Sequence, residues 1–226
     1  MKRSHLSARA RIWVALGFSS MVSVGFYIVG ALANHSTAYA YFIWNLFLAW
    51  MPVLFTGWIL WVLRRKPWSS WEGLLATALW LGFLPNSFYM ISDFIHLQEV
   101  QRVDLLYDVI MFSSFIFNGV LLGFLSLYTV HHELLKRMSW RAAAWMIAFV
   151  IFVCSFAIYL GRDLRWNTWD LLVNPAGILF GATDPLFNPH SHPQAFTTTF
   201  SFFVLVSTLY IVVWQVARLL RPQKSA

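Results

Sequence analysis

Six long apolar stretches constrain the fold of this chain more than any other feature. A helix needs roughly 20 mainly apolar residues to cross the hydrocarbon core of a bilayer. Six stretches approach or exceed that length: 12–32, 42–63, 72–91, 105–130, 142–160 and 196–217. None alternates with the two-residue period of a membrane β-strand, and all are too long for one. We therefore expect an all-α fold, a polytopic membrane helical bundle of about six transmembrane helices in one integral membrane domain, 1–226.

Composition supports this class. Charged residues make up only 11% of the chain and hydrophobic residues 59%, whereas soluble domains carry about 25% charged residues. The single cysteine, Cys154, lies in an apolar stretch, so neither an intrachain disulfide nor a cysteine-based metal site is possible.

The basic residues predict the orientation of the bundle. Most of the 16 lysines and arginines fall at the N-terminus, after the second and fourth stretches, and in the C-terminal tail. The positive-inside rule then places both termini in the cytoplasm, with an even number of spans. We expect a multi-pass membrane protein, with the bilayer as its main partner. The net charge of +7 is read as a topology signal, so no nucleic acid partner is expected.

The N-terminus permits another interpretation. Basic residues, an apolar run and Ala38-Tyr39-Ala40 together resemble a cleavable signal peptide. The run of about 20 residues exceeds the 7–15 usual for a signal, so we expect an uncleaved first span. Cleavage would leave five spans and an N-terminus outside.

The third stretch ends in unusual polar chemistry, LPNSFYMISDFIHL at 84–97. At 100° per residue, an arc of about 80° on one helix face contains Asn86, Tyr89, Asp93 and His96. Intramembrane polar groups are costly and count as functional candidates. In the structural alternative, Asn86 satisfies a carbonyl freed by Pro85, and Asp93 and His96 merely end the helix in water.

Two further polar clusters are predicted at the same end of the bundle. Asp108 lies one turn inside the fourth span. If the segment YLGRDLRWNTWD (159–170) is helical, Arg162 and Arg165 share one face. Asn167 and Asp170 share a neighbouring face. Guanidinium groups suit carboxylates or phosphates. The alternative is that these arginines form interhelical ion pairs with aspartates.

Several other segments carry weaker signals. The loop 161–195 is long, and its apolar centre 171–180 is too short to span, so it either dips into the membrane or lies flat. His190 and His192 form a possible metal pair, but we interpret them as exposed loop histidines. His131, His132 and Glu133 are interpreted as interfacial residues. The pair Gly119 and Gly123 predicts a close helix contact.

Four segments resemble a known family: FLPNSFYMISDFIHL (83–97), LLYDVIMFSSF (105–115), LLGFLSLYTVH (121–131) and FAIYLGRDLRWNTWDLLVNP (156–175). They are similar to the bacterial integral-membrane family catalogued as domain of unknown function 1361, over roughly residues 45–217. The chain departs from that pattern at Ser87-Phe88, where Ala-Pro is common. The resemblance implies a multi-pass inner-membrane protein and carries over no activity.

Two classes of function remain open. In the first, the protein is an enzyme acting on a lipid-linked or anionic envelope ligand at the outer face. Its acid/base or metal-binding groups would be Asp93, His96 and Asp108. The ligand would be bound by Asn86, Tyr89, Arg162, Arg165, Asn167 and Asp170. One outward-open pocket would then contain Asp93, His96, Asp108, Arg162 and Asp170.

In the second class, the same charges form the ion-pair network of a non-catalytic assembly or structural protein. A small-solute transporter ranks lower, because few polar residues continue through the membrane. The sequence identifies no cofactor, metal or oligomeric state.

Overall fold

The computed structural model describes residues 8–99, 105–163 and 173–220, and all secondary structure in these ranges is helical. The α-helices are α1 (Ala8–Asn34), α2 (Tyr41–Val62), α3 (Trp71–Tyr89), α4 (Leu105–Leu134), α5 (Trp140–Asp163), α7 (Pro175–Phe187) and α8 (Pro193–Leu219). Two 3₁₀ helices complete the set, η1 (Met90–Glu99) and η2 (Pro189–Ser191). Six segments are long and apolar enough to cross a membrane, which confirms the predicted fold class.

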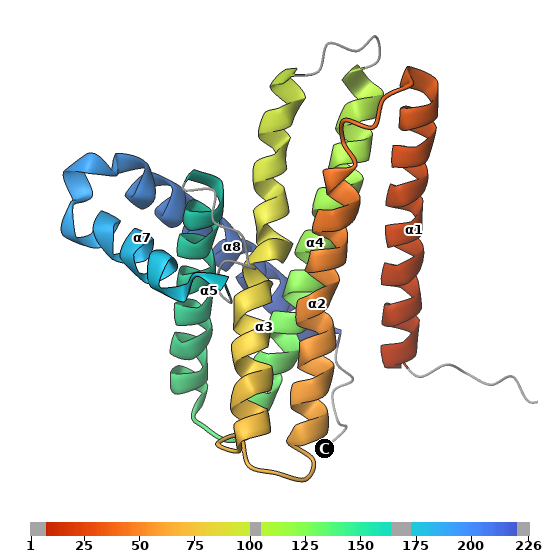
Figure 1. Ribbon diagram of the computed structural model, residues 1–226. Coiled ribbons are helices and arrows are strands. Elements are labelled where there is room, and N and C mark those ends of the chain that lie inside the picture. Colours follow the sequence, from red (N-terminus) through yellow and green to blue (C-terminus); the bar gives the residue numbers. More distant parts are fainter. Residues whose placement is uncertain (1–7, 100–104, 164–172, 221–226) are drawn as a thin grey trace, which may run out of the picture.

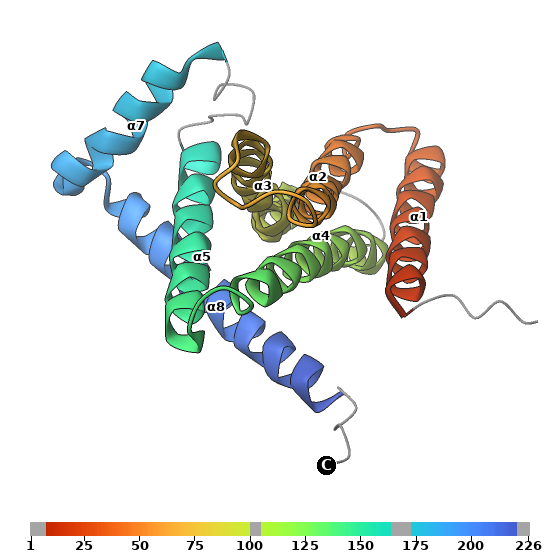
Figure 2. The same ribbon diagram turned by 90° about the horizontal axis from the view of Figure 1, so that it is seen from below.

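The six segments follow the predicted spans closely. The third differs most, because α3 continues into η1 and the apolar segment reaches Leu97 instead of residue 91. Within the predicted long loop, α7 has 13 residues, too few to cross the bilayer. Figures 1 and 2 show α7 running obliquely beside α5 rather than parallel to it.

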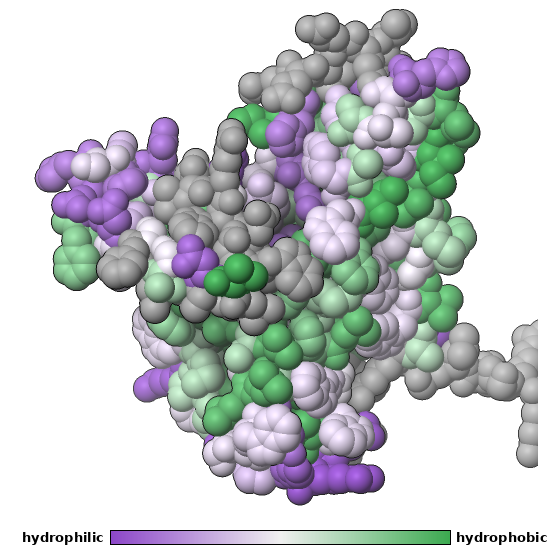
Figure 3. Space-filling view, viewed as in Figure 1, coloured by the Kyte–Doolittle hydropathy of each residue, from purple (hydrophilic) through white to green (hydrophobic). Residues whose placement is uncertain are grey.

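Helices α2, α3 and α4 form the centre of the bundle. Helix α2 packs against α3 and α4, α1 packs on α4, and α8 packs on α5. In Figure 1 the α2–α3 and α4–α5 turns lie at the lower end, and the α1–α2 turn and η1 lie at the upper end. We name the lower end, which carries Arg64–Lys66, Lys136, Arg137 and Arg218, the basic end, and the upper end the distal end. Figure 3 shows hydrophobic side chains between hydrophilic groups at both ends.

A close contact between α4 and the α3–η1 segment confirms the glycine-pair prediction. A Cβ atom on Gly119 would lie 2.5 Å from Met90 Sδ, and one on Gly123 would lie 2.8 Å from Ser87 Cβ. Small residues allow membrane helices to approach closely. Because no hydrophobic driving force acts between helices in lipid, the van der Waals packing at such a contact contributes to their association.

A buried hydrogen-bond network links α2, α3 and α4 below this contact. The hydroxyls of Thr56 and Ser126 lie 2.8 Å apart, and the Trp80 indole N–H donates to Ser126 Oγ at 2.7 Å. Both hydroxyls also lie within hydrogen-bond distance of the Pro52 carbonyl, at 2.8 and 3.2 Å. Polar groups in the hydrocarbon core must be satisfied within the protein, so this network joins the three central helices.

At the basic end, two of the residues predicted to be interfacial, His131 and Glu133, are buried within the protein. Their position relative to a membrane surface stays a prediction. His131 Nδ1 lies 2.8 Å from the Tyr210 hydroxyl of α8. Glu133 forms ion pairs with Lys136 and Arg137.

Candidate functional site

The third span, which carries the predicted polar stripe, changes from an α-helix to a 3₁₀ helix within the stripe. Helix α3 ends at Tyr89, and the ten residues of η1 follow as a 3₁₀ helix. Runs of 3₁₀ helix longer than three or four residues are uncommon and often mark strain or a functional hinge. The prediction of a continuous α-helical stripe is therefore wrong beyond Tyr89. With three residues per turn, Asp93 and His96 are stacked on one edge of η1.

Asp93 is the central residue of this site. Its side chain is only 3% exposed, and its Oδ2 accepts a hydrogen bond from Asn45 Nδ2 of α2 at 3.1 Å. Sequence reasoning missed Asn45. The same rule that selected Asp93, a polar side chain inside an apolar span, also applies to Asn45.

Two groups that can carry positive charge act on this buried carboxylate. His96 of η1 and Arg162 of α5 both interact electrostatically with Asp93, and both are half-buried. The His96 ring also packs edge-on against Tyr41, with centroids 5.5 Å apart. The structure thus brings together three predicted site residues, Asp93 and His96 of η1 and Arg162 of α5. Asn45 of α2 is a fourth residue of this site.

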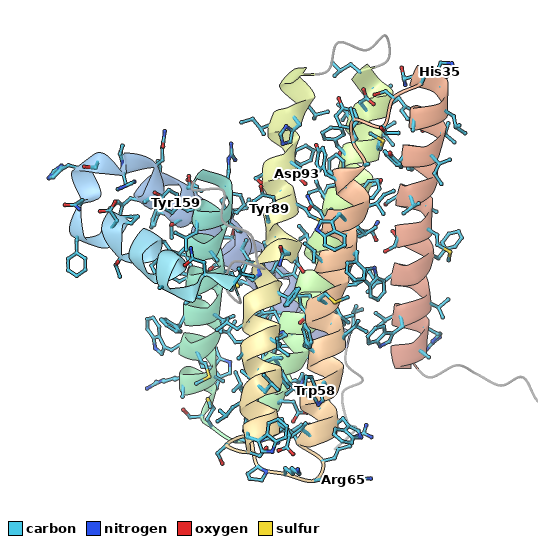
Figure 4. All side chains as sticks on the ribbon, viewed as in Figure 1. His35, Trp58, Arg65, Tyr89, Asp93 and Tyr159 are labelled. Atoms are coloured by element: carbon cyan, nitrogen blue, oxygen red, sulfur yellow. The ribbon has the colours of Figure 1, made fainter. Side chains whose placement is uncertain are left out.

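Figure 4 shows the level of this site in the bundle. Asp93 and Tyr89 lie near the height at which α5 ends, marked by Tyr159, and above them η1 and α4 continue upward. Asn86 donates to the Phe83 carbonyl of its own helix at 3.0 Å. This bond favours a structural role for Asn86, whereas Tyr89 remains half-buried beside the site.

Asp108 is the third residue predicted to act as an acid, a base or a metal ligand. It is 1% exposed on α4, and the adjacent Tyr107 hydroxyl donates to the Phe26 carbonyl of α1 at 2.6 Å. Across the part of the chain that the structure describes, no three His, Cys, Asp or Glu side chains are placed to share a metal ion. The predicted metal-ligand role of Asp93, His96 and Asp108 therefore gains no support from the described residues and stays a prediction.

The remaining predicted residues, Arg165, Asn167 and Asp170, lie outside the described residues. The proposed convergence of Asp170 with the other four residues therefore stays a prediction.

A second polar cluster was not predicted. The Asp184 Oδ2 atom of α7 lies 2.8 Å from His192 Nε2, and His192 Nδ1 lies 3.2 Å from the Tyr159 hydroxyl of α5. A neutral ring with its proton on Nε2 donates to Asp184 and accepts from Tyr159. The prediction of an exposed loop histidine is wrong for His192, which is half-buried, because this chain of bonds joins α7, the start of α8, and α5.

The Asp184 cluster gives a pH prediction. Hydrogen bonds from Asn188, at 2.7 Å, and from His192 hold the pKa of the Asp184 carboxyl below its ordinary value. A lowered carboxyl pKa contributes stability above the pKa of the unfolded chain, about 3.9, and this contribution is lost as the pH falls through the folded-state pKa.

We therefore expect Asp184→Asn to lower the thermal midpoint slightly at pH 6 and to lower it less near pH 3. Thermal unfolding of both proteins in detergent at the two pH values measures this difference. An equal difference at both pH values would contradict the role of the Asp184 charge.

The helices and the buried polar side chains between them define a multi-pass helical membrane protein. Within this class, the chain belongs to the family described as Protein of unknown function (DUF1361), whose sequence model matches residues 44–208. This range includes Asn45, Asp93, His96 and Arg162, so the whole described site lies in the family region. No curated protein and no solved structure matches the chain.

Proposed function

We propose that this protein binds an anionic, lipid-linked ligand at the distal end of the bundle, from the outer side of a bacterial inner membrane. The proposal is supported by the electrostatic interaction of the buried Asp93 carboxylate with two groups that can carry positive charge, His96 of η1 and Arg162 of α5. The orientation rests on the excess of basic residues at the other end.

Arg162 is the group proposed to contact the ligand. A guanidinium is always charged and has five N–H donors, and its planar shape suits a phosphate. Because Arg162 is half-buried, part of it is accessible. Asp93 is too buried to contact a ligand directly, so its proposed role is to attract and orient the guanidinium. Arg165, on the same predicted helix face, would supply a second guanidinium.

The test is to identify the lipids that co-purify with the wild-type protein and with Arg162→Gln by mass spectrometry. A hydrogen bond to a charged group contributes about 1.5–3 kcal/mol, so we expect occupancy of the distal site to fall at least about tenfold, a loss of about one anionic lipid per protein in the variant. Arg64→Gln is the matched control, because it removes an exposed cation at the basic end. Equal anionic lipid in wild type and Arg162→Gln would overturn the proposal.

One observation favours the structural alternative. The hydrogen bond from Asn45 to Asp93 joins α2 to η1 and would stabilise the distal end of the bundle in the absence of any ligand. Asn45→Leu separates the two roles, because it removes the hydrogen bond to Asp93 and leaves the charges of Asp93, His96 and Arg162 in place. Reduced thermal stability with unchanged lipid content would favour the structural role. The catalytic role of Asp93, His96 and Asp108 stays a prediction.

A further inference from the structure

A cavity of about 420 Å³ opens at the basic end, far from the Asp93 site. It is lined by Leu135, Trp140, Trp214 and Arg218. These residues come from the turn that follows α4, the start of α5 and the last turns of α8. Figure 2 shows the ends of α4 and α5 beside α8 when the bundle is seen from below.

The charge of this cavity is not neutralised within the described parts of the chain. The acidic residues at this end already have cationic partners, because Glu72 pairs with Lys66, and Glu133 pairs with Lys136 and Arg137. No ion pair of Arg218 occurs among the described residues, and its side chain is exposed. A permanent cation in a cavity at the membrane boundary is complementary to an anion.

The two tryptophans indicate what kind of anion fits. Trp214 is held in place by stacking on His131, with ring centroids 4.2 Å apart, and His131 is in turn bonded to Tyr210. Trp140 is 61% exposed and forms the open wall. Indole rings have apolar faces and one N–H donor, and they favour the level of lipid headgroups.

The surface beside the cavity suits acyl chains. On α8, Val212, Val216 and Leu219 are all exposed, and only 11% of the apolar window of this helix is buried. A ligand with its charge at Arg218 could therefore extend its apolar part along α8. A free phosphate ion would leave the indole and leucine walls unused.

We propose that this cavity binds an anionic glycerophospholipid, with the phosphodiester at Arg218, the headgroup between Trp140 and Trp214, and the chains along α8. Basic cavities between membrane helices are suited to anionic headgroups. A zwitterionic lipid fits less well, because its headgroup brings a second cation close to Arg218. This site is at the opposite end from the proposed distal site and does not depend on it.

The test is a native mass spectrometry titration of the full-length protein with dioleoyl phosphatidylglycerol and, separately, dioleoyl phosphatidylcholine. It is performed in the wild-type and Arg162→Gln backgrounds, so that any lipid at the distal site is counted separately. We expect Arg218→Gln to weaken phosphatidylglycerol binding about fivefold in both backgrounds, the effect of roughly 1 kcal/mol for one basic residue at an anionic surface. Arg64→Gln should change the affinity less than twofold.

A second pair of variants tests the cavity wall. Trp140→Ala should weaken phosphatidylglycerol binding, whereas Trp145→Ala, an exposed tryptophan of α5 that does not line the cavity, should not. Equal weakening by Arg218→Gln and Arg64→Gln would overturn the proposal in favour of a diffuse charge effect. Equal affinity for the two lipids, or displacement of the lipid by millimolar inorganic phosphate, would also overturn it.

Discussion

Replacing Gly123 by valine is expected to lower the free energy of unfolding by about 1–3 kcal/mol, the usual cost of overpacking a filled core. The first added carbon alone would lie 2.8 Å from Ser87 Cβ and 2.9 Å from Phe88 Cζ. Both neighbours are fully buried and surrounded by other helices, so neither can move away without separating α3 from α4. Since η1 continues from α3, this separation would also displace Asp93.

The matched control is Gly57→Val in α2, where an added Cβ has no neighbour within 4 Å. Both variants lose a helical glycine and gain the same β-branched side chain, so their difference reports the helix contact. Unfolding in mixed detergent micelles, followed by circular dichroism, measures it. Equal free energies of unfolding for the two variants would show that the α3–α4 contact at Gly123 does not determine the stability of the bundle.

Replacing Ser126 by alanine is expected to cost about 1–2 kcal/mol. The change removes the acceptor of the Trp80 indole N–H and the hydroxyl partner of Thr56. A buried donor without an acceptor costs about 1–3 kcal/mol, although interhelical hydrogen bonds in membrane proteins average only about 0.6 and reach about 1.7 kcal/mol. Thr56 keeps the Pro52 carbonyl as an acceptor. The destabilisation therefore comes mainly from the Trp80 indole N–H, which loses its acceptor.

Ser155→Ala provides the comparison. Ser155 is also buried, and its hydroxyl bonds only to the Ile151 carbonyl of its own helix among the described contacts. Its removal should therefore be nearly neutral under the same unfolding conditions. If Ser155→Ala were as destabilising as Ser126→Ala, the interhelical network would contribute no more than a local helix bond.

The sequence alone was sufficient to predict the six spans and the clustering of basic loops. Apolar length and the number of charges are local properties, and the bilayer imposes them on each helix separately. For the same reason, the polar residues Asp93, His96 and Arg162 could be selected as a group, because each lies near the same end of its span.

Other parts of the site depended on how the helices pack. Asn45 became Asp93's partner only because α2 lies against η1. The pairing of His192 with both Asp184 and Tyr159 required α7 to lie beside α5 and α8. The burial of His131 required α8 to cover the end of α4.

The sequence by itself therefore determined that this is a helical membrane protein, approximately where its spans begin and end, and which end of the bundle carries the basic residues. Only the tertiary structure decided that η1 is a 3₁₀ helix, which side chains hold Asp93, and where a cavity opens beside Arg218. The physical reason is that hydropathy acts on one helix at a time. Hydrogen-bond partners, close contacts and cavities instead depend on the rotation and crossing of neighbouring helices, which periodicity within a single span does not specify.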